Sequence, residues 1–287
     1  MWKEIAAKIS ETTGQPFEIT THRSVGGGCI NQSYSVSDGT LSYFVKINQA
    51  NQIDMFEAEY LGLQQMYDTQ TIRIPQPLCC SIAGDSSFIV MEWLEFGRGD
   101  SRAWELMGQN LAKLHQAKGS DRFGWNRNNT IGSTPQINPW SDNWSDFFAE
   151  QRIGFQLRLA KRRGGNFPDT GKVVARVKDI LSDRNPQPSL VHGDLWSGNA
   201  ACTVAGEPVI LDPATYWGDR EVDLAMTELF GGFPAAFYRG YNQTWQLDRD
   251  YETRKPLYNL YHVLNHFNLF GGGYESQARS TIDRLLP

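Results

Sequence analysis

A spaced set of polar side chains near residue 200 is the feature that most constrains the fold of this chain. The stretch 191–199 reads V-H-G-D-L-W-S-G-N and places Asp194 and Asn199 on one short loop, and the apolar run 209–211 ends at Asp212. An extended turn can point Asp194 and Asn199 into one cleft, and Asp212 would arrive there from the next strand pair. The chain must therefore bring these strand ends together around a polar cleft.

An acid, an amide and a second acid in this order are typical of a phosphoryl-transfer site. Asp194 would accept the proton of a substrate hydroxyl, and Asn199 and Asp212 would bind Mg²⁺ through oxygen atoms. The alternative is structural, because Asp and Asn in such loops often only stabilise turns. The ordered set, together with a Gly-rich loop and a strand lysine far upstream, favours the chemical interpretation.

The Gly-rich loop lies between two segments of β-like sequence. Gly26, Gly27 and Gly28 carry no Cβ, so their backbone can approach phosphate oxygens closely. The run matches neither of the common phosphate-loop patterns, and a tight turn is the alternative. Cys29 follows in the same loop, where its oxidation could block a bound nucleotide or where it only fills space.

A predicted hairpin follows, and its second strand carries a lysine. Asp38-Gly39 is a strong turn signal between the two strands. Side chains alternate along strand 41–47, so Lys46 shares a face with Phe44. Lys46 could reach the α- and β-phosphates of a nucleotide, whereas a lysine in the middle of a strand usually points into solvent.

Two further segments complete a predicted nucleotide site. The helix predicted over 55–66 supplies a carboxylate to orient Lys46; we prefer Glu57 to Glu59, and either could instead lie on an exposed helix face. Strand 88–94 would meet the adenine edge through the Glu92 carbonyl and the Leu94 amide. An edge strand followed by a loop is the alternative.

The spacing of apolar residues becomes helical after Arg102, as in Trp104, Met107, Leu111 and Leu114. We therefore predict an α+β fold with two lobes. Residues 1–94 would form an N-terminal nucleotide-binding lobe with an antiparallel sheet and a helix. Residues 95–287 would form a larger, mainly helical C-terminal lobe for catalysis and substrate binding.

Composition excludes several classes of function. The chain has 287 residues and a net charge of −5, with no basic block to displace counterions from nucleic acid. No apolar run is long enough to cross a bilayer, and the first residues lack the apolar core of a signal peptide. We expect a cytoplasmic protein without a membrane partner. The four cysteines fit neither a disulfide framework nor a zinc pattern, which predicts free thiols.

The motifs together resemble those of the fructosamine kinase (ketosamine 3-kinase) family, which belongs to the aminoglycoside- and choline-kinase-like set of protein-kinase-like folds. The resemblance spans nearly the whole chain. It is carried by H-G-D-L-W-S-G-N at 192–199, D-P-A at 212–214 with Y-W-G-D-R-E at 216–221, and F-F-A-E-Q-R at 147–152. H-G-D-x-x-x-x-N alone marks only the superfamily, whereas the longer block with W-G-D-R-E is specific to the family.

This resemblance implies that the γ-phosphate of ATP is transferred, with Mg²⁺, to O3 of a ketosamine such as a fructosamine or ribulosamine. The role implied is deglycation of proteins or amino acids. Carried over, Asp194 is the base, Asn199 and Asp212 bind Mg²⁺, Lys46 with Glu57 orients the phosphates, and residues 26–28 cover the nucleotide. His192 resembles a brace of the catalytic loop. We expect a monomer that acts on a small ketosamine or a glycated protein.

A ketosamine carries hydroxyls and a cationic amine, so its pocket needs acceptors and an aromatic wall. Trp196, Trp217, Asp219 and Glu221 have these chemistries close to the catalytic residues in sequence, but each could equally be structural. Two other functions stay open. One is a kinase of another hydroxyl substrate, such as an aminoglycoside, choline or homoserine. The other is a nucleotide-binding pseudokinase scaffold, which the joint presence of the lysine, both acids and the amide disfavours.

Overall fold

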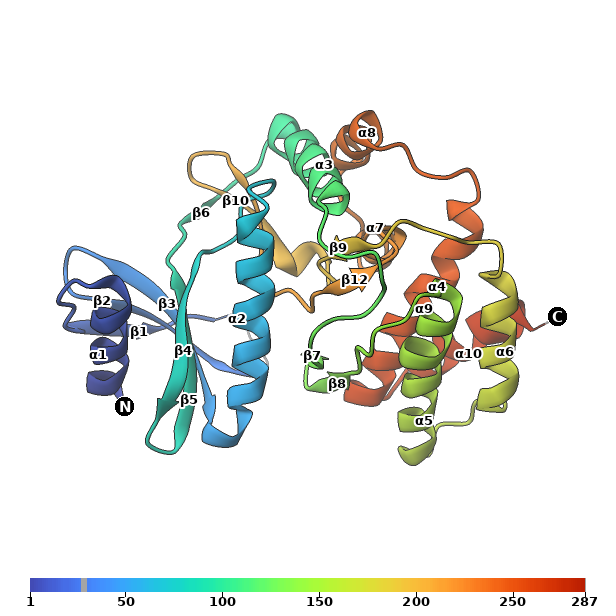
Figure 1. Cartoon of the computed structure of the whole chain (residues 1–287), viewed down its shortest axis with the longest axis horizontal. Helices are drawn as coiled ribbons and strands as arrows, with labels where there is room; N and C mark the ends of the chain where they lie inside the picture. Colours follow the sequence, from blue (N-terminus) through green and yellow to red (C-terminus); the bar gives the residue numbers. More distant parts are fainter. Residues whose placement is uncertain (27–29, 287) are drawn as a thin grey trace.

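The computed structural model describes residues 1–26 and 30–286. An antiparallel sheet with two helices forms one side of the molecule, and a mainly helical part lies beside it (Figure 1). The predicted α+β fold with two lobes is therefore confirmed. Gly27, Gly28 and Cys29 lie outside the described residues, so the expectations for them stay predictions.

The N-terminal sheet has five strands in the order β1-β2-β3-β5-β4, and all neighbours are antiparallel. They span Thr21–Ser24 (β1), Gln32–Ser37 (β2), Ser42–Gln49 (β3), Pro77–Ala83 (β4) and Ser86–Glu92 (β5). The predicted turn joins β2 to β3: Asp38 Oδ1 accepts the Thr40 and Leu41 amide hydrogens at 2.7 Å each, and Gly39 has a φ of 100°. This turn fixes the register of β2 with β3, in which Lys46 lies opposite Ser33.

One helix covers each face of this sheet. Helix α1 (Trp2–Thr13) packs on one face, and α2 (Ile53–Asp68), which follows the 3-10 turn η1 (Ala50–Gln52), packs on the other (Figure 1). Val45 of β3 belongs to the small core under α1, whereas Phe44 packs on the α2 side. Because side chains alternate along a strand, Lys46 shares the side of Phe44 and points toward α2.

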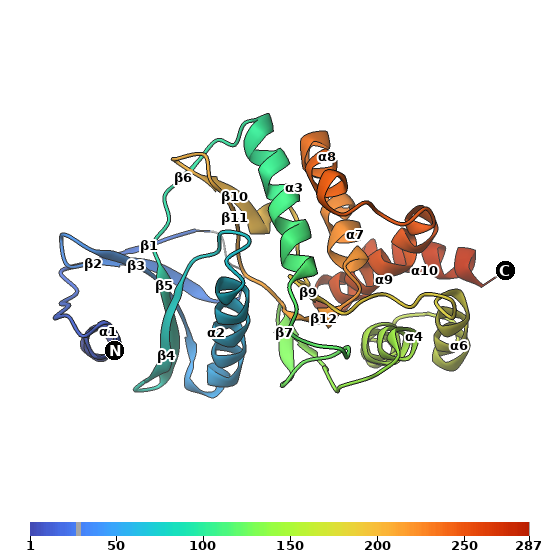
Figure 2. The same ribbon diagram turned by 45° about the horizontal axis from the view of Figure 1, so that its top comes forward.

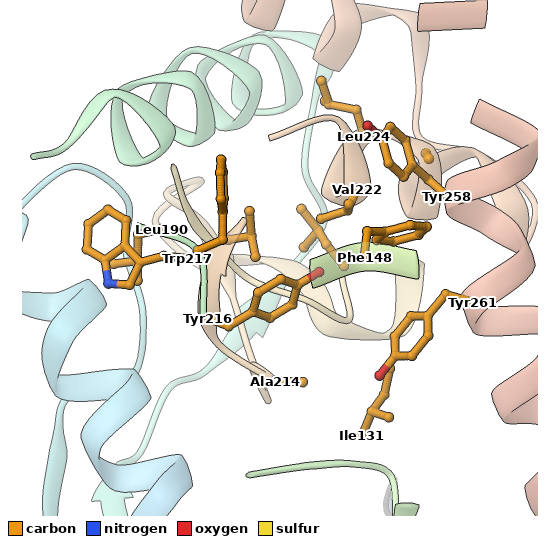
Figure 3. Close-up of a cluster of buried hydrophobic side chains, with 14 of the residues drawn as sticks. Ile131, Phe148, Leu190, Ala214, Tyr216, Trp217, Val222, Leu224, Tyr258 and Tyr261 are labelled. Carbon is orange, nitrogen blue, oxygen red and sulfur yellow. The ribbon is translucent and has the colours of Figure 1, made fainter. Parts of the chain in front are cut away.

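The rest of the chain is mainly helical. Its helices are α3 (Ser101–Gln116), α4 (Trp144–Phe147), the π-helix η2 (Phe148–Gly154), α5 (Phe155–Arg162), α6 (Thr170–Ile180), η3 (Ser197–Asn199), α7 (Glu221–Leu229), α8 (Ala235–Thr244), α9 (Tyr251–Phe270) and α10 (Tyr274–Leu285). Side chains from several of these helices meet in a buried cluster that includes Phe148, Tyr258, Tyr261 and Tyr216 (Figure 3). This cluster is the support on which the functional loops rest.

Short strand pairs carry those loops. Strand β9 (Ser189–Val191) pairs with β12 (Tyr216–Gly218), and β10 (Ala200–Thr203) pairs with β11 (Pro208–Ile210) and with β6 (Phe96–Gly97). A separate hairpin, β7 (Asn129–Ile131) with β8 (Thr134–Gln136), lies beside α2 in both views (Figures 1 and 2). Cys79, Cys80 and Cys202 are free thiols, as predicted. Within residues 1–26 and 30–286, no helix combines the length and apolar character needed to cross a membrane.

Candidate active site

The loop after β9 brings Asp194 and Asn199 together. Asn199 Nδ2 donates a hydrogen bond to the Asp194 carbonyl oxygen at 2.8 Å and lies 3.4 Å from Asp194 Oδ2. Gly193, at a φ of 81°, lets the loop pass close to the neighbouring chain, because a Cβ there would lie 2.2 Å from the Ala214 carbonyl oxygen. The loop therefore holds the acid and the amide on the same side, as the spacing predicted.

Asp223 of α7 holds this loop from behind. Its side chain is 1% exposed and accepts hydrogen bonds from the His192 amide at 2.7 Å, the Gly193 amide at 2.8 Å and His115 Nε2 at 3.0 Å. Burial by itself would raise the pKa of Asp223, but the hydrogen bond and charge of His115 outweigh it and hold that pKa below its ordinary value. Asp223 lies in the first turn of α7, where an acidic residue is common for helix stability alone, and His115 is remote along the chain, so local spacing gives no sign of this support.

His192 also has a bracing position. Its Nε2 lies 2.7 Å from the Leu211 carbonyl oxygen and must donate to it, and its Nδ1 accepts the Asp194 amide hydrogen at 3.2 Å. Burial lowers the pKa of His192, so the ring is neutral near pH 7. The side chain thus ties the loop of Asp194 to the residue before Asp212.

Asp212 meets Lys46 from the N-terminal sheet. Lys46 Nζ lies 2.7 Å from Asp212 Oδ1 and 2.7 Å from Glu59 Oε1. Burial opposes the charge of Lys46, but the negative charges of Asp212 and Glu59 outweigh this and raise the pKa of Lys46. Asp212 has a φ of 53°, a left-handed conformation that is uncommon for a residue other than glycine and clusters at functional sites.

The preference for Glu57 as the partner of Lys46 is wrong. Residues two apart on a helix point about 200° apart, so only one of Glu57 and Glu59 can face the sheet. Glu59 does so, and its side chain is 12% exposed. Glu57 instead lies 3.2 Å from Arg127 Nη1 and has a side chain that is 46% exposed.

The carboxylates near Asp194 favour positive charge there. Burial, followed by the charges of Asp212 and Asp223, raises the pKa of Asp194 to about 8. Asn199 Oδ1 and the second oxygen of Asp212 accept no hydrogen bond within the described residues, and the backbones of Asn199 and Leu211 are joined by a 2.9 Å hydrogen bond. Free carboxylate and amide oxygens at adjacent positions fit a hard cation such as Mg²⁺.

The described residues contain no group of three His, Cys, Asp or Glu side chains that could form a complete metal cage.

Gly26, Glu92 and Leu94 are the remaining residues predicted to bind the nucleotide that the structure describes. Gly26 has open space where a Cβ would lie. The Glu92 amide donates to the Gln76 carbonyl oxygen at 2.9 Å, and its carboxylate pairs with Arg73. Leu94 follows the end of β5, and its amide donates no hydrogen bond within the described residues. The Glu92 side chain is thus paired with Arg73, so Glu92 could meet an adenine only through its backbone, as predicted for its carbonyl.

Only one of the four predicted substrate residues is open to solvent. Trp196 is 40% exposed on the loop of Asp194, and its ring lies over Gly198, where a Cβ would come within 2.3 Å of it. Trp217 is 3% exposed and sits in the buried cluster around β12 (Figure 3).

Asp219 and Glu221 are fully buried in ion pairs. Asp219 accepts from Arg184 Nε at 2.8 Å and from the Tyr258 hydroxyl at 2.8 Å. Glu221 accepts from Nε and Nη2 of Arg254 at 2.8 Å each. The expectation that Trp217, Asp219 and Glu221 contact the substrate is therefore wrong. They are close to Asp212 in sequence, but β12 and the start of α7 lie inside the helical part and bury their side chains.

The chain is similar in sequence to a known family of kinases. The family model described as fructosamine kinase matches residues 1–287. A "Probable ketoamine kinase" of Synechocystis is 63% identical over 285 residues, which covers 99% of this chain and 97% of that protein. A chloroplastic protein-ribulosamine 3-kinase of Arabidopsis thaliana is 44% identical over 280 residues, or 96% of this chain and 85% of that protein.

Solved structures of kinases have a similar fold. A crystal structure from Haemophilus somnus, of a candidate fructosamine-3-kinase, has a TM-score of 0.94 and 33% identity, and the match covers 100% of this chain and 98% of that one. A choline kinase of Streptococcus pneumoniae has a TM-score of 0.65 at 16% identity, over 99% of this chain and 98% of that one, and shares the fold alone. Because the family model matches residues 1–287, the whole of this chain, the chain belongs to the fructosamine kinase family.

Proposed function

We propose that this protein is an ATP-dependent kinase that phosphorylates O3 of a ketosamine, such as a fructosamine or ribulosamine adduct, and so begins deglycation. One observation carries the proposal. A partly buried acid with a raised pKa, Asp194, lies in one loop with Asn199, and the lysine of the sheet is held by Asp212 at the end of the next strand pair. Family membership supplies the substrate class.

Asp194 acts as the general base. The raised pKa of Asp194, about 8, makes its ionised carboxylate a stronger base than that of an ordinary aspartate, and this carboxylate takes the proton of the attacking hydroxyl as the new bond to phosphorus forms. Asn199 Nδ2 holds the backbone of Asp194 in place. Trp196, the exposed aromatic on the same loop, supplies a wall for the sugar or its amine.

Lys46 orients the phosphates of the nucleotide. Glu59 and Asp212 fix its ammonium group at 2.7 Å from each carboxylate, so the charge stays in place before a nucleotide binds. Asn199 and Asp212 would hold Mg²⁺, which supplies neutralisation of the charge that develops on phosphate oxygens. Residues 26–28 cover the nucleotide, and the Glu92 carbonyl and Leu94 amide meet its adenine edge.

Two finer points belong to the same proposal. Residues 1–94 and 95–287 act as the nucleotide lobe and the catalytic lobe. The protein works as a cytoplasmic monomer, on a free or a protein-bound ketosamine.

A second candidate is a kinase of another hydroxyl substrate on the same fold, since the choline kinase of Streptococcus pneumoniae shares the architecture. The test is ADP release by the purified protein with Mg-ATP and a panel of fructosamines, ribulosamines, aminoglycosides and choline. Activity confined to ketosamines supports the proposal. Activity with choline or aminoglycosides alone moves the protein to the second candidate, and nucleotide binding without any turnover indicates a pseudokinase.

The same assay tests the base. Asp194→Asn should lower turnover by roughly 10²- to 10⁴-fold, the usual scale of general-base catalysis, while nucleotide affinity is retained. Asp183→Asn, at an exposed position, serves as the matched control. Near-normal turnover of Asp194→Asn would rule out its role as the base.

A further inference from the structure

Helix α2, which carries Glu59, is held from the side opposite the sheet by residues of the C-terminal part. Figures 1 and 2 both show α2 between the N-terminal sheet and the segment that leads into β7. Arg127 belongs to that segment, and its Nη1 lies 3.2 Å from Glu57 Oε2. Its Nη2 donates a hydrogen bond to the Asp54 carbonyl oxygen at 3.3 Å. These contacts fix the first turns of α2.

A second contact fixes the other end of the same helix. Trp125 is 4% exposed, and its indole Nε1 donates to Gln65 Oε1 at 2.8 Å. Glu57 and Gln65 are eight residues apart, or about 12 Å along a helix axis. Two anchors at this separation restrain both the position and the tilt of α2.

The helix also lies close to the C-terminal part between these anchors, at Gly62. A Cβ at Gly62 would lie 2.9 Å from Thr215 Oγ1 and 3.2 Å from Thr215 Cβ. Thr215 follows Asp212 by three residues, so this contact joins α2 directly to the strand connection that carries Asp212. A side chain at this position would force α2 or Thr215 to shift.

The anchoring segment is itself bonded to the same strand connection. Gly124 and Trp217 exchange two backbone hydrogen bonds of 3.0 and 2.8 Å, and Asn129 Nδ2 donates to the Thr215 carbonyl oxygen at 2.8 Å. Residues 123–131 therefore link α2, which carries Glu59, to the chain that carries Asp212. These are the two carboxylates that hold Lys46.

We propose that Trp125 and Arg127 are positioning residues of the kinase reaction: by anchoring α2 they set the spacing between Glu59 and Asp212, and thereby the place of the Lys46 ammonium beneath the phosphates. The inference rests on the proposed nucleotide role of Lys46. It implies that the Lys46–Glu59 pair is held assembled by the fold and does not depend on an outside activator.

Three variants test this in the full-length protein. Arg127→Ala removes one anchor, Trp125→Phe keeps an aromatic ring but removes the hydrogen bond to Gln65 and part of the indole, and Gly62→Val inserts a side chain between α2 and Thr215. Valine is no worse than glycine in helix propensity, so Gly62→Val perturbs the contact more than the helix itself. Arg122→Ala is the matched control, because Arg122 lies in the same region but pairs with Asp142 at an exposed site.

The first readout is the affinity for Mg-ATP and for a non-hydrolysable analogue, measured by calorimetry on protein with a normal unfolding midpoint. We expect about tenfold weaker binding in Arg127→Ala and Gly62→Val, and kcat/KM for ATP lower by about 10- to 100-fold, the scale of a 1 Å misplacement. The KM for the ketosamine should change little, and Arg122→Ala should stay within about twofold. If Arg127→Ala does not fold, Trp125→Phe and Gly62→Val decide the question.

The second readout is coupling to Glu59. If Arg127 acts through the Glu59–Lys46 pair, Arg127→Ala should lose most of its effect on nucleotide affinity in a Glu59→Gln background. Equal effects in both backgrounds, or unchanged nucleotide affinity in folded variants, would overturn the inference. A wild-type protein that binds nucleotide but turns over no ketosamine would refute the proposed function instead, and the affinity comparison would still decide the role of the anchors.

Discussion

Replacement of Asp223 by asparagine tests how the catalytic loop is held. The two carboxylate oxygens face two different backbone amides: Oδ2 accepts from His192 and Oδ1 from Gly193. Asparagine has nearly the same shape but only one acceptor oxygen. In either orientation of the amide, its NH₂ group meets a buried backbone N–H.

The expected cost follows from these contacts. A buried N–H left without a partner costs about 1–3 kcal/mol, and the remaining bonds lose roughly 1 kcal/mol when their acceptor becomes neutral. We therefore expect Asp223→Asn to lower the free energy of unfolding by about 2–4 kcal/mol, a large share of the total for a folded protein. The loop that carries Asp194 should shift at the same time, because its backbone loses an anchor.

Two measurements check this. Urea unfolding should show a lower midpoint with an unchanged slope, and turnover should fall by at least about tenfold, since misplacement of a catalytic group by 1 Å can cost 10²-fold. Affinity for nucleotide in the absence of Mg²⁺ should be retained, because Lys46 and its two carboxylates are untouched. Asp283→Asn, at an exposed site on α10, is the control. A stability change below about 0.5 kcal/mol with normal turnover would refute the view that Asp223 holds the loop.

Three further predictions concern packing, pH and the metal. Gly108→Ala should destabilise the fold by about 1–3 kcal/mol, although alanine has the better helix propensity. The reason is that the added Cβ would lie 2.0 Å from the Phe237 carbonyl oxygen where α3 crosses α8. A variant that is more stable in thermal unfolding would contradict this. Burial lowers the pKa of His262 to about 3, so below pH 6.5 the unfolded chain binds a proton that the folded one does not, and stability should fall by about 1.4 kcal/mol per pH unit. His262→Gln should remove about 2 kcal/mol of the loss between pH 6.5 and 5, and parallel stability–pH curves for the two proteins would exclude this cause. Asp212→Ala should abolish the Mg²⁺ dependence of ATP binding in a titration of the ion, and an unchanged dependence would argue against its role as a ligand.

Features that depend on local spacing could be predicted from the sequence. The turn at Asp38-Gly39 fixed the register of β2 with β3, and the alternation along β3 placed Lys46 on the face of Phe44. Asp194 and Asn199 share one short loop, so their proximity needed no knowledge of the rest of the fold. Periodic apolar patterns likewise predicted a helical C-terminal part.

The sequence by itself thus indicated a two-lobed α+β fold, the family resemblance and the loop that holds Asp194 with Asn199, because these rest on patterns and motifs that are local in the chain. Only the tertiary structure decided that Glu59, and not Glu57, faces Lys46, since either face of an amphipathic helix can turn inward until the sheet and residues 123–131 pack against it. Packing also decided that Asp219 and Glu221 are buried in ion pairs and that His115 supports Asp223. These contacts join residues far apart in the chain, and their energies depend on burial that no local pattern specifies.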